Sequence, residues 1–450
     1  MVIDCKPFVS DSKSGAAAAG MPDLQIVALS VAATAGRPAA DLEKVAQESI
    51  GDIVNGLTKM PASAAAASQA PAKPKPAAIL SFTGETYAQA VDNLEKFFQV
   101  NRWTDGLPLV PPTREAVAAM LKGTDLPRDH VLGIVDPKKG MATVEKVAIN
   151  AVMAGAKPAY MPLILAAVMA LTDPAFDLYG VQCTGGLTAP LLIVSGPIMR
   201  DLNINFTYST LGPGWRANST IGRATRLILI NLGQAWPGIN DMKDVGNPAK
   251  FGMLMAENEV QTPSGWPTLR EQEGFNKEAS TVSVYSALSF RQIGCIFGDP
   301  LDYIAGNMKT ALNSQASQWG EEVVVVLSPT NAEILAKRGY TPDAIRKELF
   351  KRGKVTRKYF GPRPLGTIGV AQGVPKWIDA LPDEGLVPTV PRAEDIKVFV
   401  SGGRGPGCGF FIDRWGFGQS RFLTKEIKLP PNWAELVKDL SGWETPVEVK

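Results

Sequence analysis

Short apolar runs that alternate with helical segments constrain the fold of this chain more than any other feature of its sequence. The runs are rich in valine, leucine and isoleucine, as buried strands are, and they occupy residues 24–33, 191–196, 280–288, 323–328 and 396–403. Between the runs, apolar residues recur at helical spacing, and threonine or serine marks helix starts at positions 83, 113, 143, 328 and 341. The alternation predicts a mixed α/β fold with a partly parallel sheet and helices on both faces.

A stretch rich in alanine, proline and lysine divides the chain. Residues 60–79 have no apolar period, which is typical of an extended, solvated linker. Residues 1–59 contain an expected flexible start, one strand and one helix, which is too little to bury a core alone. We therefore expect three parts: a short βα unit at 1–59, the linker at 60–79 and one large α/β body at 80–450.

The charge balance and the single histidine exclude several function classes. The 450-residue chain carries 46 lysines and arginines against 44 aspartates and glutamates, which argues against a nucleic-acid-binding protein. Because His130 is the only histidine, a multi-histidine metal site is excluded. A Ser-His-Asp or Cys-His centre would have to be built around that one residue. We expect no metal site, and the sequence leaves the identity of any cofactor unknown.

The cysteine pattern and the hydropathy indicate a cytoplasmic protein without a membrane partner. Four scattered cysteines, no two of them at CxxC spacing, predict free thiols rather than a disulfide framework. No secretory signal is evident, and the most apolar stretch, residues 160–171, is too short to span a bilayer. The helix expected at 158–171 is apolar on most faces, which suits either a core helix or the interface of a homo-oligomer.

Two glycine-rich turns carry cysteines, and glycine lets a ligand approach the backbone closely. One turn contains the sequence QCTGG, and the other, GGRGPGCG, follows the last apolar run. In the second turn an arginine would lower the pKa of the nearby thiol or bind an anionic substrate. The alternatives are a buried structural cysteine in the first turn and an ordinary tight turn in the second. The candidate residues are Cys183, Gly402, Gly403, Arg404 and Cys408.

A third glycine turn, at 212–214, precedes an expected long helix that begins with Arg216, Asn218 and Ser219. Free amides at a helix N-terminus, with an arginine beside them, form a suitable anion site. The alternative is plain N-capping by Asn218 or Ser219 with a solvated arginine. The turn lacks the GK[ST] ending of a nucleotide-binding P-loop.

Paired carboxylates follow a further apolar run. Glu257 and Glu259 come after residues 251–256 and would share one face of a strand. Close carboxyl groups push their pKa values apart, so the pair suits acid–base catalysis, and the alternative is a solvated strand end. Asp105 is another candidate, although Asp-Gly is first of all a turn signal.

These segments together resemble the large domain of the UGSC family, bacterial proteins named for a short selenocysteine or cysteine motif. The likeness covers about residues 80–427, and residues 21–59 resemble the second half of the small UGSC domain. The family is distantly similar to the substrate-binding selenoprotein B of glycine and betaine reductases, which implies thiol-based attack on a small organic substrate. No UGSC motif occurs in the chain, and Gly407-Cys408 stands where the resemblance implies a His-Ser pair. The blocks that carry the likeness are WTDGLPLVPPT (103–113), VEKVAINAVMAGAKPAYMPLILAAV (144–168), LYGVQCTGG (178–186), LGPGWRANSTIGRATRLILINLG (211–233), AENE (256–259) and VFVSGGRGPG (398–407).

Three functions are consistent with these residues. In the first, a thiol-dependent oxidoreductase or lyase, a cysteine thiolate attacks or reduces a small organic anion that the arginines hold, and a glutamate moves protons. In the second, a hydrolase or lyase without a metal uses the glutamates and arginines, and the cysteines are structural. In the third, the chain is a non-catalytic small-molecule-binding or assembly protein.

Overall fold

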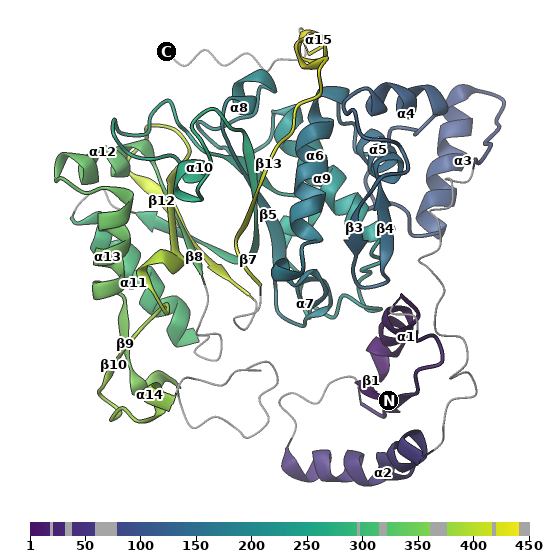
Figure 1. Ribbon diagram of the computed structural model, residues 1–450, viewed down its shortest axis with the longest axis horizontal. Helices are drawn as coiled ribbons and strands as arrows, with labels where there is room; N and C mark the ends of the chain where they lie inside the picture. The colour runs from purple at the N-terminus through teal and green to yellow at the C-terminus, as the bar shows by residue number, and fades with distance from the viewer. Residues whose placement is uncertain are drawn as a thin grey trace.

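The computed structural model of the chain describes residues 1–18, 21–31, 38–58, 79–294, 298–314, 322–360, 376–415 and 420–440. Nearly all of the expected linker lies outside these ranges, and so does Cys295. The described part is mixed α/β, as predicted. One curled sheet lies between two groups of helices, and a small parallel unit is formed by the N-terminal residues (Figure 1).

Seven strands form the main sheet in the order β11-β8-β12-β7-β5-β6, and β13 pairs with β7 off this path. The pairs β5–β6 and β8–β11 are parallel, whereas β12 and β7 run antiparallel to their neighbours. The sheet is therefore mixed and partly parallel. Its strands are β5 (Ala189–Ser195), β6 (Leu254–Ala256), β7 (Thr281–Gly294), β8 (Val323–Leu327), β11 (Ile396–Val400), β12 (Cys408–Arg414) and β13 (Leu423–Glu426).

The sheet curls until its two ends meet. Strands β6 and β11 are last and first in the strand order, yet the Asn258 amide donates to the Val400 carbonyl at 2.7 Å. The Ser401 hydroxyl donates to the Ala256 carbonyl at 2.6 Å. The carboxyl ends of β6 and β11 therefore lie side by side, and such strand ends are where open α/β sheets hold their ligands.

Each half of the sheet has its own helices and its own core. Helices α5 (Val144–Met153), α6 (Met161–Leu171) and α9 (Arg216–Asn231) share a core with β5 and β7. On the other half, α11 (Pro300–Ser314), α12 (Pro329–Lys337) and α13 (Pro342–Arg352) share a core with β8 and β11. All of α6 except Met169 is buried within the chain itself, so this apolar helix is a core helix and not a free subunit interface.

Side-chain caps begin many of the helices where the sequence predicts them. Thr113, Thr143, Ser328 and Thr341 each accept a backbone amide of the helix that follows. These four expected caps are confirmed, but the expected cap at Thr83 is wrong, because Thr86 caps α3. The smaller elements are α3 (Tyr87–Val100), α4 (Arg114–Leu121), β3 (Val131–Val135), β4 (Gly140–Thr143), α7 (Leu178–Cys183), α8 (Ile198–Asp201), α10 (Leu269–Gln272), β9 (Lys354–Thr356), α14 (Lys376–Asp379), β10 (Leu386–Pro388) and α15 (Trp433–Lys438).

The N-terminal unit has more structure than the sequence predicts. The expected strand and helix appear as β2 (Ile26–Leu29) and α2 (Ala39–Thr58). The expectation of a flexible start is wrong, because β1 (Val2–Cys5) pairs in parallel with β2, and α1 (Val9–Ala18) connects them. In a strand–helix–strand unit the connecting helix packs on the two paired strands, whereas a single strand has no partner. This pairing explains why β1, α1 and β2 form a regular structure.

Candidate functional site

Four polar side chains converge at the carboxyl ends of β5 and β6, and we call them the carboxyl-edge cluster: Ser195, Glu257, Glu259 and Arg270. Ser195 is the last residue of β5, and its Oγ lies 2.5 Å from Glu257 Oε2 and 3.2 Å from Glu259 Oε1. Arg270, on α10, donates to the same Oγ at 3.2 Å and forms an ion pair with Glu259. The Ser195 hydroxyl therefore connects the two glutamates that the sequence predicts to be an acid–base pair.

Glu257 is the buried acid of this cluster. Burial raises the pKa of the Glu257 carboxyl to about 8. The hydrogen bond from Ser195 lowers this pKa, and the negative charge of Glu259 raises it further. The Leu269 amide donates to both carboxyl oxygens, at 2.9 and 3.0 Å. The raised pKa favours the protonated form of Glu257, which is the form that the acid of a carboxyl pair takes.

Glu259 is the outer member of the cluster, with about 20% of its side chain exposed. The Gly196 amide donates to its Oε1 at 2.6 Å. Position 196 requires glycine, because its φ is +115° and an added Cβ would lie 2.5 Å from the Ala279 carbonyl oxygen. The glycine turn and the Arg270 guanidinium together hold the Glu259 carboxylate at the boundary between the cluster and solvent.

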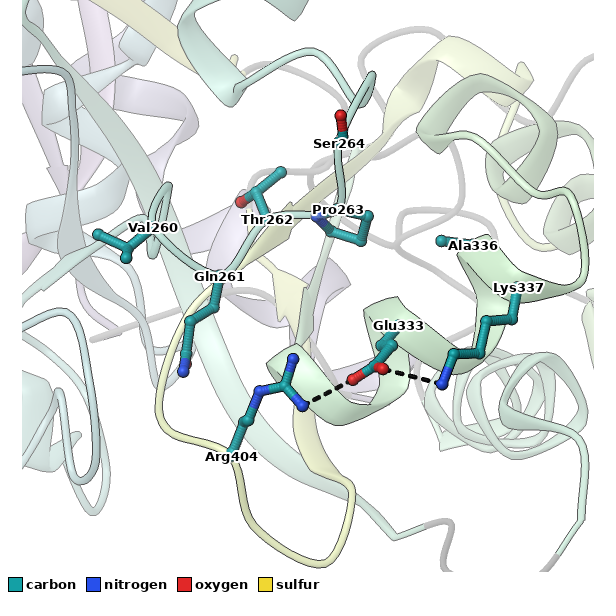
Figure 2. Close-up of a pocket in the computed structure, with 9 residues that line it drawn as sticks. All are labelled: Val260, Gln261, Thr262, Pro263, Ser264, Glu333, Ala336, Lys337 and Arg404. Atoms are coloured by element: carbon teal, nitrogen blue, oxygen red, sulfur yellow. Dashed lines mark ion pairs between the residues drawn. The ribbon is translucent and has the colours of Figure 1, made fainter. Parts of the chain in front are cut away.

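A hollow of about 470 Å³ lies next to the segment that continues from Glu259 (Figure 2). Two cationic side chains, Arg404 and Lys337, lie at its rim. Both pair with Glu333 of α12, at 2.8 and 2.9 Å respectively. With two positive charges to one negative charge, the rim suits a small anion. The lining residues are Val260, Gln261, Thr262, Pro263, Ser264, Glu333, Ala336, Lys337 and Arg404.

The turn that carries Arg404 is positioned by the cluster's own segment. The buried Asn258 side chain donates to the Gly402 carbonyl at 2.8 Å. Gly403 lies against the Tyr208 ring, and a Cβ on Gly403 would come within 2.4 Å of it. Gly402 and Gly403 therefore shape the turn, and Arg404 is the residue of the turn that meets the hollow. The structure thus brings the glycine-rich turn that carries Arg404 and the glutamate pair to the same end of the sheet.

The other predicted binding residues have structural partners elsewhere. Helix α9 begins at Arg216 after an extended Trp215, so the expectation that Asn218 or Ser219 caps it is wrong. Asn218 is buried and bonds to the backbone of Asn205 and Thr210, whereas Ser219 is exposed. Arg216 donates to the Gly155 carbonyl at 3.0 Å, and Asp105 pairs with Arg223 at 2.8 Å.

The two candidate cysteines lie in different surroundings, and neither belongs to the carboxyl-edge cluster. Cys183 ends α7, before β5 begins, and so lies toward the opposite end of that strand from Ser195 (Figure 1). Burial, followed by the charge of Asp11, raises the pKa of the Cys183 thiol. Cys408 is exposed at the start of β12, and its Sγ lies 3.0 Å from Gln292 Nε2. The structure therefore does not gather the thiols and glutamates into one pocket.

Ser195 and Arg270 are the members of the cluster that the sequence analysis missed. A serine at the end of an apolar strand is a usable signal, since strand ends face ligands. Arg270 gives a weaker signal, because it lies inside the capping box of Thr268 and Glu271, which by itself indicates only a helix start.

Among the described residues, no three histidine, cysteine, aspartate or glutamate side chains are grouped as metal ligands. No helix within the described ranges is both long and apolar enough to cross a membrane. No family model, curated protein or solved structure matches the chain.

Proposed function

We propose that this protein is a hydrolase or lyase that performs acid–base chemistry on a small organic anion at the carboxyl-edge cluster. The observation that carries the proposal is the Ser195 hydroxyl, which lies 2.5 Å from a buried acid and 3.2 Å from a partly exposed carboxylate. Two carboxyl groups so connected divide into a neutral acid and an ionised base. Glu257 is the acid, and Glu259 is the base.

The hydrogen bonds supply a route for the proton. Glu259 takes a proton from bound water or from the substrate, because its carboxylate is the cluster member open to solvent. Glu259 then gives that proton to the leaving group and in the same step receives the Ser195 proton, while Ser195 Oγ receives the proton of Glu257. Reversal of the last two transfers reprotonates Glu257 and returns Glu259 to the carboxylate, so no atom is gained or lost.

The charges at the hollow define the class of substrate. Arg404 and Lys337 lie on its rim and share the single carboxylate of Glu333. A carboxylate or phosphate group of a small organic molecule would compete for these cations, and arginine binds such groups with two parallel hydrogen bonds. We therefore assign the hollow to the anionic group and the Glu259 side to the reacting atoms.

A second candidate is thiol chemistry of the type implied by the UGSC resemblance, and Cys408 is the observation that favours it. Its thiol is exposed and follows the turn that carries Arg404 by only a few residues. Kinship with that family stays a proposal as well.

The test incubates wild type, Glu259→Gln and the Cys183→Ser/Cys408→Ser double variant with a panel of small carboxylates, carboxylic esters and phosphate monoesters. Proton NMR follows the conversion of each compound. Wild type is expected to convert a panel member, and Glu259→Gln to lose about a hundredfold or more of that rate, the usual size of an acid–base contribution. The Cys183→Ser/Cys408→Ser double variant is expected to keep the wild-type rate.

Two other outcomes would each overturn the acid–base proposal and select one of the alternative functions. Loss of activity in the cysteine variant with retention in Glu259→Gln selects the thiol mechanism. Thermal stabilisation by a panel member, with no conversion by any of the three proteins, selects a binding protein.

A further inference from the structure

A second polar cluster lies at the other end of the main sheet, around Cys183. Four cationic side chains of the large body gather there: Lys138, Arg226, Lys243 and Lys250. Lys243 is almost completely buried, with 1% of its side chain exposed, and Arg226 is also buried. Burial and the charge of Arg226 lower the pKa of Lys243 and of Lys250 to about 7. The cations therefore crowd one another in a poorly solvated region.

The body supplies few carboxylates to balance these charges. Asp241 pairs with both Lys243 and Lys250, and Asp136 pairs with Lys139. Within the described ranges Arg226 has no carboxylate at ion-pair distance, and its hydrogen bonds to Gln182 Oε1 and the Ala235 carbonyl are long, at 3.4 and 3.5 Å. A buried cationic excess of this kind attracts an anion.

That anion comes from the N-terminal unit. Asp11 of α1 is buried, and its carboxylate lies 2.7 Å from Lys138 Nζ and 4.0 Å from Cys183 Sγ. The Asn240 amide group also donates to it. These three groups all belong to the large body, more than a hundred residues away in the sequence. The Asp11 carboxylate is therefore held by the body as a bound carboxylate ligand would be.

We propose that Lys138, Cys183 and Asn240 form a binding site for a small carboxylate, and that Asp11 occupies this site as a tethered substitute that shields the thiol. Buried Arg226, which within the described ranges has no carboxylate at ion-pair distance, adds positive charge beside the site. This site is independent of the carboxyl-edge cluster, which lies at the opposite end of β5. Removal of the Asp11 side chain leaves room and charge for a free carboxylate such as acetate.

The experiment uses the full chain with Asp11→Ala and follows alkylation of each cysteine by iodoacetamide, with peptide mass spectrometry. The exposed Cys408 serves as the internal reference. Cys183 is expected to react slowly in wild type and about tenfold faster in Asp11→Ala, because thiol reactivity follows exposure and thiolate content. Millimolar acetate, compared with chloride at equal ionic strength, is expected to slow Cys183 again and to raise the Tm of the variant only.

Asp41→Ala is the matched control, since Asp41 is an exposed acid of α2 in the same unit and should leave Cys183 alkylation unchanged. Unchanged Cys183 alkylation in Asp11→Ala overturns the shielding. Faster alkylation without protection by acetate overturns the carboxylate site. If Asp11→Ala loses its cooperative melting transition, Asp11→Ser replaces it under the same acetate criterion, because serine keeps a polar contact and leaves space beside Lys138.

Discussion

The free energy of unfolding of the wild-type protein is expected to fall as the pH rises from about 4.5 to about 8, because Glu257 ionises over this interval. In the Glu257→Gln variant this contribution to the pH dependence is expected to be absent. The folded protein favours the protonated carboxyl, whereas in the unfolded chain the group ionises at its ordinary pKa. The stabilising contribution is complete below the unfolded pKa and disappears as the pH passes through the folded value. At 1.36 kcal/mol per pKa unit, the wild type loses roughly 5 kcal/mol over this interval.

Urea denaturation at a series of pH values checks this result, and the informative quantity is the difference between variant and wild type. Glutamine keeps the size of Glu257 and can still accept the Leu269 amide. Glu435→Gln, on the exposed surface of α15, is the control and should follow the wild-type curve. Parallel curves for Glu257→Gln and wild type would show that Glu257 is ionised in the folded protein, and the acid assigned to the cluster would then be wrong.

Replacement of Glu322 by glutamine is expected to lower the free energy of unfolding by about 3–5 kcal/mol, the usual cost of breaking a buried ion pair. Arg414 is among the largest fully buried side chains, and its Nη1 lies 3.0 Å from Glu322 Oε2. The Phe422 amide donates to the same oxygen at 2.7 Å. Without the carboxylate charge, the guanidinium group of Arg414 remains buried and uncompensated.

Chemical denaturation at neutral pH measures this effect. Asp343→Asn is the matched control, because its pair with Lys347 is exposed on both sides, and such pairs contribute about 0–1 kcal/mol. Replacing both partners, as Glu322→Leu/Arg414→Met, should recover most of the loss, since a hydrophobic pair of similar size needs no counter-charge. A Glu322→Gln protein as stable as wild type would mean that Arg414 does not depend on this carboxylate.

The fold class was predictable because it depends on local patterns. The apolar run at 323–328 forms a fully buried strand, and Thr143 caps its helix with a side-chain hydrogen bond. Only neighbouring residues determine these features. The start of α9 was mispredicted for the same reason. Asn218 has the character of a capping residue, but the buried loop around Asn205 uses its side chain instead.

The candidate site was predictable only in part, because its members are distant in sequence. The close spacing of Glu257 and Glu259 indicated their pairing, yet nothing local connects them to Ser195, about sixty residues earlier. Their meeting depends on the parallel register of β5 and β6, where Val194 lies opposite Ala256. Cys183 shows the converse. Its glycine-rich context suggested a shared pocket, and the direction of β5 carries it away from the glutamates.

The curl of the main sheet also affects how the protein behaves among its own copies. An open sheet exposes unpaired amides on its edge strands, and these recruit strands from other chains into aggregates. Here β6 has only three residues and β11 five, and the Asn258 amide and the Ser401 hydroxyl are bonded across the gap between them. The contacts at the candidate site therefore leave β6 and β11 little unpaired edge for a foreign strand, so variants at Asn258 or Ser401 are expected to lower the solubility of the protein.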